Sequence, residues 1–214
     1  MKTQTAISEL LSKCEFRLEE ECSQSFNRLN QERIIKLLVP LLKAASAGPD
    51  LKQLAEKSLL RHFFWNATAF DNNSMNAPYS GQPYWTRQAV LQYLSNAKVN
   101  FGKRHSGLRH EHAVPIKLLK EKAWEKPYQV GDLILQFSRA VVVTIKEDDQ
   151  FKKHGLNDRM PIGFDWKSAQ IFQRYEKAKV GPILDVRKSP ELWELLTCNK
   201  KRFSELSNSI TVIA

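Results

Sequence analysis

The sequence predicts an α+β fold that is mostly helical and contains a small β-sheet. Apolar residues recur at helical spacing through much of the 214-residue chain. Residues 140–145, in contrast, form a short β-branched run that is typical of a buried strand. A chain of this length can bury a core without a disulfide framework. Its three cysteines form no Cys-x-x-Cys pair, so neither a disulfide scaffold nor a knuckle zinc site is expected.

The expected elements follow from periodicity, caps and breakers. The predicted helices span residues 3–23, 31–45, 50–62, 87–94, 116–124, 130–137 and 166–178. The predicted strands span residues 140–145, 182–186 and 210–214. Asp50 and Thr86 stand where helix N-caps are expected. Residues 66–83 are rich in Asn, Ser, Gly and Pro, which predicts a long loop. Polar residues 146–151 follow the clearest strand at once, which indicates a strand that leads into a helix.

The charge balance favours a polyanionic partner. The formal net charge is +10 and the sequence pI is about 9.5. No apolar run approaches the ~18 to 20 residues of a membrane-spanning helix. The first residues lead into an amphipathic stretch and not into the apolar core of a signal peptide. We therefore expect a soluble cytoplasmic protein with no membrane association, for which nucleic acid is the favoured partner.

Residues 108–115 concentrate groups that can do chemistry. Three of the five histidines, His105, His110 and His112, lie within eight residues, and Glu111 separates the last two. Basic residues surround them at Lys98, Lys103, Arg104, Arg109, Lys117, Lys120, Lys122 and Lys126. In an extended segment His110 and His112 share one face and Glu111 takes the other. This pattern suits a zinc site, a magnesium-type site beside a histidine base, or histidines that only hydrogen-bond in a surface turn.

The segment Glu111-His112-Ala113-Val114-Pro115 resembles the motif of HNH, or ββα-metal, nucleases. In that family the first strand commonly ends in an acidic residue and the catalytic histidine, with a proline three positions later. Downstream, Val142-Val143-Thr144 followed by Glu147-Asp148-Asp149 resembles the second strand and the start of the metal-binding helix. Gly163-Phe164-Asp165 and Arg174-Tyr175 continue the resemblance, which covers roughly residues 104–186. A long segment, residues 116–139, separates the two halves of the motif here.

The resemblance implies catalytic roles for particular side chains. His112 is expected to be the general base and Glu111 a metal ligand. Arg109 or Arg104 is expected to stabilise charge on the phosphate, with His110 as an accessory group. The second metal ligand is expected from the later helix, in the order Asp149, His154, Asp148 and Asn157.

The resemblance also implies a cofactor and a surface for the substrate. The expected cofactor is a divalent metal, Mg²⁺ or Mn²⁺ first and Zn²⁺ as the alternative. The nucleic-acid contacts are expected from Lys103, Arg104, Lys117 and Lys120.

Three regions and one leading function are therefore expected. Residues 1–97 would form a helical N-terminal region, residues 98–186 an HNH-like nuclease core, and residues 187–214 a C-terminal extension with a helix and a strand. The implied function is a metal-dependent endonuclease that hydrolyses DNA phosphodiester bonds, with a candidate role in restriction or antiviral defence. The alternatives are a non-catalytic nucleic-acid-binding protein and a zinc hydrolase with a small substrate. The N-terminal helices could serve as a homodimer interface or dock a partner protein.

Overall fold

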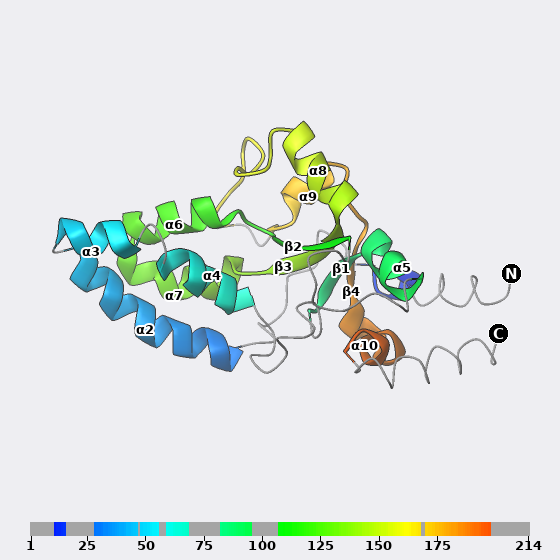
Figure 1. Ribbon diagram of the computed structural model, residues 1–214, viewed down its shortest axis with the longest axis horizontal. Coiled ribbons are helices and arrows are strands. Elements are labelled where there is room, and N and C mark those ends of the chain that lie inside the picture. Colours follow the sequence, from blue (N-terminus) through cyan, green and yellow to red (C-terminus); the bar gives the residue numbers. More distant parts are fainter. Residues whose placement is uncertain are drawn as a thin grey trace, which may run out of the picture.

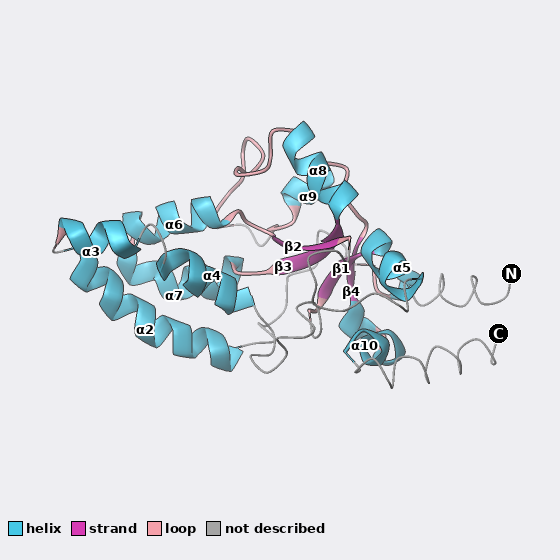
Figure 2. Ribbon diagram, viewed as in Figure 1, coloured by secondary structure: helices cyan, strands magenta, loops and turns pink. Residues whose placement is uncertain are grey.

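A four-stranded sheet joins a long helical arm to a group of shorter helices. The computed structural model describes residues 11–15, 28–46, 48–55, 59–68, 82–95, 107–167 and 170–197. Figure 1 shows the arm at the left, built from helices that extend away from the sheet. These are α2 (Arg28–Ser46), α3 (Pro49–Leu54), α4 (Leu60–Thr68), α6 (Ile116–Glu125) and α7 (Val130–Phe137). The helix-rich α+β class predicted from the sequence is confirmed, as Figure 2 makes plain.

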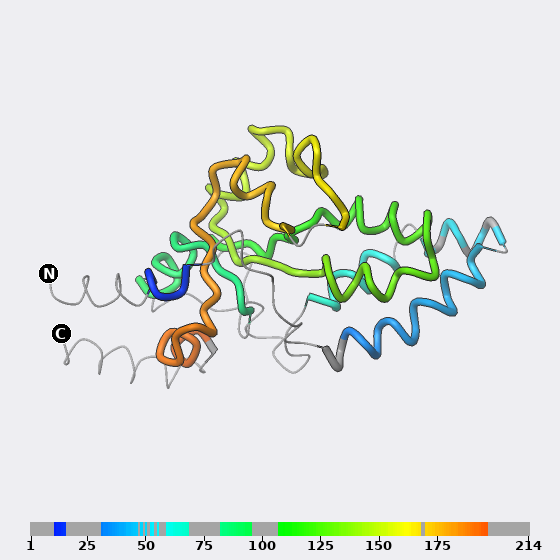
Figure 3. The backbone as a smooth tube through the Cα atoms, turned by 180° about the vertical axis from the view of Figure 1, so that it is seen from behind, coloured from blue at the N-terminus to red at the C-terminus, as the bar shows by residue number. Residues whose placement is uncertain are grey.

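The remaining elements form the sheet and its covering helices. The strands are β1 (Tyr84–Thr86), β2 (Leu108–His112), β3 (Ala140–Thr144) and β4 (Ile183–Asp185). The helices around them are α5 (Arg87–Ser95), α8 (Ile145–Lys153), α9 (Gln173–Lys177) and α10 (Pro190–Thr197), with the 3₁₀ turn η3 (Val186–Lys188), while the 3₁₀ turn η2 (Pro127–Gln129) joins α6 to α7 in the arm. Seen from behind in Figure 3, α6 leaves the end of β2 and α7 returns the chain to β3. The arm therefore includes an insertion between two paired strands.

The strand order is β2-β3-β1-β4, so β2 lies at one edge. β2 and β3 are antiparallel, with Arg109 opposite Val143 and His110 opposite Val142. β1 runs parallel to β3 and antiparallel to β4. Because paired residues share a face of a sheet, Arg109 and Glu111 lie on one face and His110 and His112 on the other.

Two apolar clusters cover these two faces. The larger cluster joins the arm and helices α8 and α9 to one face, and includes Leu38, Phe64, Ile134, Val141 and Phe151. The smaller cluster packs α5 and α10 against the other face, and includes Trp85, Val90, Val142, Leu184 and Leu195. β3 is buried along its whole length, since its side chains enter both clusters in alternation. This explains why residues 140–144 are apolar at every position before the capping threonine.

Several expected elements are confirmed. Helix α2 contains the predicted residues 31–45, α6 extends the predicted 116–124 by one residue, and α7 has the predicted bounds. Strand β3 passes into α8 as expected, and β4 lies within the predicted 182–186. Thr86 does cap α5, since its hydroxyl accepts a hydrogen bond from Ala89 N at 3.2 Å.

Other expectations need correction. The helix expected over residues 50–62 does not end at His62, because α4 continues to Thr68, and its first turn begins at Pro49 in α3. Leu60 and Phe64 are both fully buried and lie one turn apart, so the apolar face extends past His62. Among the described residues the predicted helix over 166–178 is limited to α9, and Trp166 and Lys167 lie in a turn where Asp165 accepts a hydrogen bond from Lys167 N at 2.9 Å.

Strand β1 was not expected, and it lies in the region predicted to be helical. Its three residues are all buried, but three positions are too few to show an alternating pattern. Most of the predicted helix over residues 3–23, residues 69–81 of the predicted loop and the predicted strand over 210–214 lie outside the described residues. No helix in the described part of the chain combines the length and apolar character needed to cross a membrane.

Candidate active site

Strands β2 and β3 and helix α8 form a compact strand–strand–helix unit. Thr144 ends β3 and caps α8, since its hydroxyl accepts from Glu147 N at 3.2 Å while Glu147 accepts from Thr144 N at 2.9 Å. This reciprocal capping box satisfies donors at the start of the helix. Glu147 also accepts a hydrogen bond from Thr86 at 2.7 Å. The first turn of α8 is therefore fixed to both β3 and β1.

The face of β2 that is turned toward α8 and α9 carries Arg109 and Glu111. The Glu111 carboxylate forms an ion pair with Arg174 of α9 through its Oε1 atom. The Tyr175 hydroxyl donates to the Glu111 main-chain oxygen at 3.1 Å. Helix α9 thus holds Glu111 by both its side chain and its backbone. We call Arg109, Glu111, Asp148 and Arg174 the carboxylate face.

Arg174 is a fully buried cation, with 0 % of its side chain exposed. Its guanidinium carbon lies 4.3 Å from the centre of the Phe151 ring, which stabilises the positive charge. Burial lowers the pKa of Arg174 to about 10, so it remains protonated at neutral pH. Its Nε and Nη1 atoms have no hydrogen-bond partner among the described residues. Glu111 is therefore the ionic partner of this buried charge.

Of the residues considered as a second ligand, Asp148 is on the buried face of α8. It precedes the buried Phe151 by three residues and so shares its helix face. Burial raises the pKa of the Asp148 carboxyl, while the charges of Lys152 and Arg109 act in the opposite direction. Phe151 lies against the Arg174 guanidinium that pairs with Glu111, so this face of α8 is turned toward β2.

The other residues expected as a second ligand are placed elsewhere. Asp149 pairs with Lys152 at 3.1 Å on the outer side of α8. His154 is exposed at the C-terminal cap of that helix, and Asn157 is exposed beyond it. The structure brings neither His154 nor Asp149 to the carboxylate face. Asp148 and Asp149 are adjacent in α8 and therefore point to different sides of the helix. The sequence alone does not say which of the two sides faces β2.

His110 and His112 lie together on the opposite face of β2, as alternation predicts. Their ring centres are 5.5 Å apart, and the Trp65 ring of α4 lies 4.9 Å from His110 and 5.3 Å from His112. His112 is 4 % exposed, and its Nε2 lies 3.4 Å from the Thr68 hydroxyl. Trp65 and Thr68 were not expected at this site, because only the fold brings α4 to β2.

Both imidazoles are neutral at cellular pH. Burial lowers the pKa of His110 to about 4. Burial also lowers the pKa of His112 to about 3, helped by the charges of His110 and Arg61, although a hydrogen bond with the Phe64 main chain acts in the opposite direction. A neutral imidazole can accept a proton from water. In this arrangement Trp65 and Thr68 cover the ring that would do so.

The expected nucleic-acid contacts are only partly placed. Lys103 and Arg104 lie outside the described residues, as does His105. Lys117 forms an ion pair with Asp158 at 3.0 Å, and Lys120 is half-buried on the same helix. Arg109 is exposed on the same face of β2 as Glu111. Arg109 is therefore the expected phosphate-contacting residue that lies at the carboxylate face.

The donor atoms at the carboxylate face suit a hard cation. Arg174 bonds Oε1 of Glu111, which leaves Oε2 and the Asp148 carboxylate as oxygen donors on one side of the sheet. Mg²⁺ keeps several water ligands and is held by one or two carboxylates together with substrate phosphate. The described residues contain no group of three or more His, Cys, Asp or Glu side chains placed to hold a metal. A zinc site of three protein ligands therefore has no counterpart within these ranges.

Comparison with protein-family models, curated proteins and solved structures finds no match for this chain.

Proposed function

We propose that this protein is a metal-dependent phosphodiesterase that cleaves nucleic acid, DNA in preference to RNA, at the carboxylate face. The observation that carries the proposal is that Asp148 shares a helix face with Phe151, which contacts the Arg174 that pairs with Glu111, while the exposed Arg109 lies on the same face of β2 as Glu111. The order of strand, strand and helix agrees with the resemblance to HNH nucleases. A role in restriction or antiviral defence follows from that resemblance alone.

Each residue has a defined task in this proposal. Glu111 Oε2 and Asp148 would hold Mg²⁺ or Mn²⁺, which supplies Lewis-acid stabilisation of the phosphate and the leaving oxygen. Arg109 orients the scissile phosphate and offsets its charge. His112 is the base that the resemblance implies, but it lies on the face of β2 opposite Glu111, so it can take a proton from the attacking water only if the end of β2 rearranges. Because Trp65 and Thr68 cover His112, the contact between α4 and β2 must open when substrate binds.

A non-catalytic nucleic-acid-binding protein is the second candidate. It is favoured by the burial of His112 and by the ion pair that engages Glu111. In that case the histidines stabilise the contact between β2 and α4, and Arg109 binds phosphate without chemistry. The two candidates differ in whether a divalent metal produces cleavage.

Plasmid cleavage separates them. Supercoiled plasmid is incubated with the protein and Mg²⁺ or Mn²⁺, with and without EDTA, and nicked and linear forms are quantified on a gel. We expect metal-dependent nicking that EDTA abolishes. His112→Ala is expected to slow cleavage by about 10²- to 10⁴-fold and to leave binding nearly intact. Asp148→Asn is expected to cost about 10- to 100-fold or more, because it removes a ligand charge without leaving a cavity.

The control variants use exposed neighbours of the same residue type. Asp149→Asn on α8 and His62→Ala on α4 are expected to cleave at the wild-type rate. Glu111→Gln is a poor test, because it leaves the buried Arg174 unpaired at a cost of about 3–5 kcal/mol. Full cleavage by His112→Ala would refute its assignment as the base. Salt-dependent binding with no nicking in either metal would favour the second candidate.

A further inference from the structure

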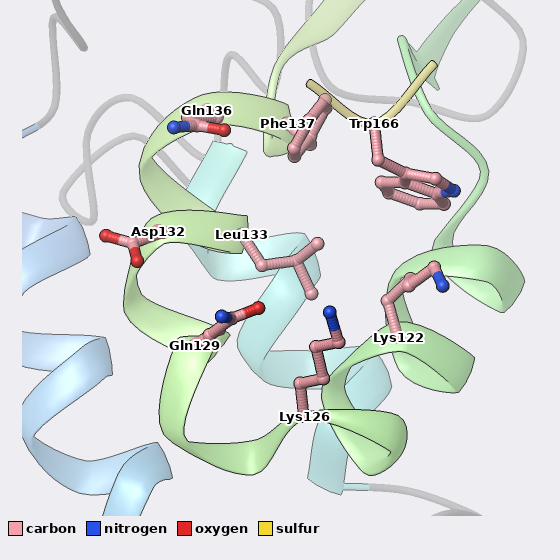
Figure 4. Close-up of a pocket in the computed structure, with 8 residues that line it drawn as sticks. All are labelled: Lys122, Lys126, Gln129, Asp132, Leu133, Gln136, Phe137 and Trp166. Carbon is pink, nitrogen blue, oxygen red and sulfur yellow. The ribbon is translucent and has the colours of Figure 1, made fainter. Parts of the chain in front are cut away.

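The insertion between β2 and β3 forms a pocket that the proposed chemistry does not use. It lies between helices α6 and α7 and the segment that follows α8 (Figure 4). We propose that this pocket binds one nucleotide of the substrate strand, with the base in the apolar part and the phosphate at the lysines. This inference rests on nucleic acid being the substrate. The residues that carry it are Lys122, Lys126, Gln129, Leu133, Phe137 and Trp166.

The size of the pocket suits a single ring system. Its volume is about 160 Å³, below the ~300–1,000 Å³ of clefts that enclose whole drug-sized ligands. A flat base can enter while the sugar and phosphate stay at the rim. The pocket is therefore suited to a unit of a longer strand that continues into solvent.

An aromatic wall is already in place. The Trp166 ring centre lies 5.1 Å from that of Phe137 and 5.3 Å from that of Phe164, and both contacts are edge-to-face. Phe137 is buried while Trp166 is half-buried, so the indole is held from behind and keeps free surface. Leu133 completes the apolar lining in Figure 4. Bases bind such surfaces by stacking and apolar contact, whatever their sequence.

Two lysine side chains line the pocket beside these aromatic rings. The Lys126 ammonium points into the pocket in Figure 4, and no carboxylate in the described ranges is bonded to it. Lys122 Nζ lies 5.5 Å from the centre of the Trp166 ring and also pairs with Glu125 at 2.5 Å. Asp132 lines the pocket too, but its carboxylate points away from the centre. The free positive charge at the pocket therefore comes first from Lys126, which favours an anionic ligand.

Two side-chain amides at the pocket favour a nucleotide over a simple aromatic acid as the ligand. The amides of Gln129 and Gln136 lie at the pocket wall. Each amide offers donors and an acceptor, and the edge of a nucleobase presents both. An aromatic carboxylate would use the rings and lysines but leave these amides without a matching partner. The combined chemistry of ring, amide and ammonium favours a nucleotide.

The pocket lies on the insertion that links β2 to β3 in the chain. Helix α6 begins directly after Pro115, four residues beyond Glu111, and Phe137 lies three residues before β3. A strand bound at the pocket is thus held by the segment that links the two strands of the strand–strand–helix unit. The insertion, which departs from the family pattern, then contributes to substrate binding.

Calorimetric titration in EDTA tests the pocket without requiring cleavage. The full chain is titrated with nucleoside 5′-monophosphates, with the corresponding nucleosides and with inorganic phosphate. We expect a monophosphate to bind with a dissociation constant of about 1 mM or below. Lys126→Ala should weaken binding about two- to five-fold. Trp166→Ala should weaken it about 5-fold or more, with Trp166→Phe retaining part of the affinity. Lys36→Ala, an exposed lysine on α2, is the matched control and should bind normally.

The outcomes separate this inference from the proposed function. Asp148→Asn should bind the monophosphate as the wild type does, because it changes only the carboxylate face. Inorganic phosphate that binds as tightly as the monophosphate would overturn the inference in favour of a simple anion site. No detectable binding of any monophosphate, or binding that neither Lys126→Ala nor Trp166→Ala weakens, would also overturn it. Nucleotide binding without plasmid cleavage would retain the pocket and refute the nuclease.

Discussion

Arg174 fixes the position of the Glu111 carboxylate in the carboxylate face. Because its guanidinium is fully buried, the charge of Glu111 compensates it and holds α9 against β2. The same contact occupies Oε1 and orients Oε2. A residue that resembles a metal ligand in the sequence is thus also part of a structural ion pair. Any variant of Glu111 therefore changes both the stability of the fold and the proposed metal site. A variant of Asp148 tests the metal site without breaking the ion pair of Arg174.

The buried histidines make stability depend on pH. In the unfolded chain a histidine has a pKa of about 6.5, whereas burial lowers the pKa of His110 to about 4 and that of His112 to about 3. Below about pH 6.5 the unfolded state binds protons that the folded state does not. The stabilising contribution is therefore full above pH 6.5 and declines as pH falls toward 4.

Urea unfolding at pH 7.5 and pH 5.0 measures this contribution. We expect a lower free energy of unfolding at pH 5.0, and His110→Gln should reduce the difference between the two conditions. His62→Gln, on an exposed position of α4, is the control and should retain the full difference. An unchanged difference in His110→Gln would contradict the burial of that imidazole.

Elements were predicted well where local signals agree with packing. Residues 140–144 are apolar up to the capping threonine, and both the strand and the junction with α8 follow from this pattern. Helix α7 buries Val130, Ile134 and Phe137 at helical spacing. Strand β1 has three residues and pairs with strands that lie distant in the chain, so no local period reveals it. Trp166 fits the helical spacing of apolar residues yet lies in a turn outside α9, which shows the limit of that signal.

The capping box at the start of α8 gives a prediction at the level of this element. Thr144→Ala removes the hydroxyl that accepts a hydrogen bond from Glu147 N and donates one to the Glu147 carboxylate. We expect a loss of about 0.5–2 kcal/mol in the free energy of unfolding, measured with urea. Asp149→Ala removes only the exposed pair with Lys152 and should cost about 0.5 kcal/mol or less. Equal losses in the two variants would contradict a specific role for the cap.

The molecule assembles its candidate site from separate stretches of chain. Glu111 and His112 come from β2, Asp148 and Arg174 from later helices, and Trp65 from the arm. Alternation along β2 was predictable, because it depends only on strand geometry. The residues that contact each face of β2 were not predictable, since they depend on how α4 and α9 pack in three dimensions. The net charge of +10 acts at the same scale, because it draws a polyanion to the whole surface.

Salt dependence tests how this charge is used. Fluorescence anisotropy with a labelled DNA duplex gives the binding constant at several salt concentrations, and its logarithm should fall linearly with the logarithm of salt concentration. Arg109→Ala should reduce the magnitude of the slope by about 1, because it removes one phosphate contact at the carboxylate face. Lys117→Ala should change the slope less, since Asp158 already pairs with that ammonium at 3.0 Å. Lys36→Ala on α2 controls for general charge loss and should leave the slope unchanged. If Arg109→Ala and Lys36→Ala gave the same slope, the DNA would not contact the carboxylate face through Arg109, and attraction by net charge alone would account for binding.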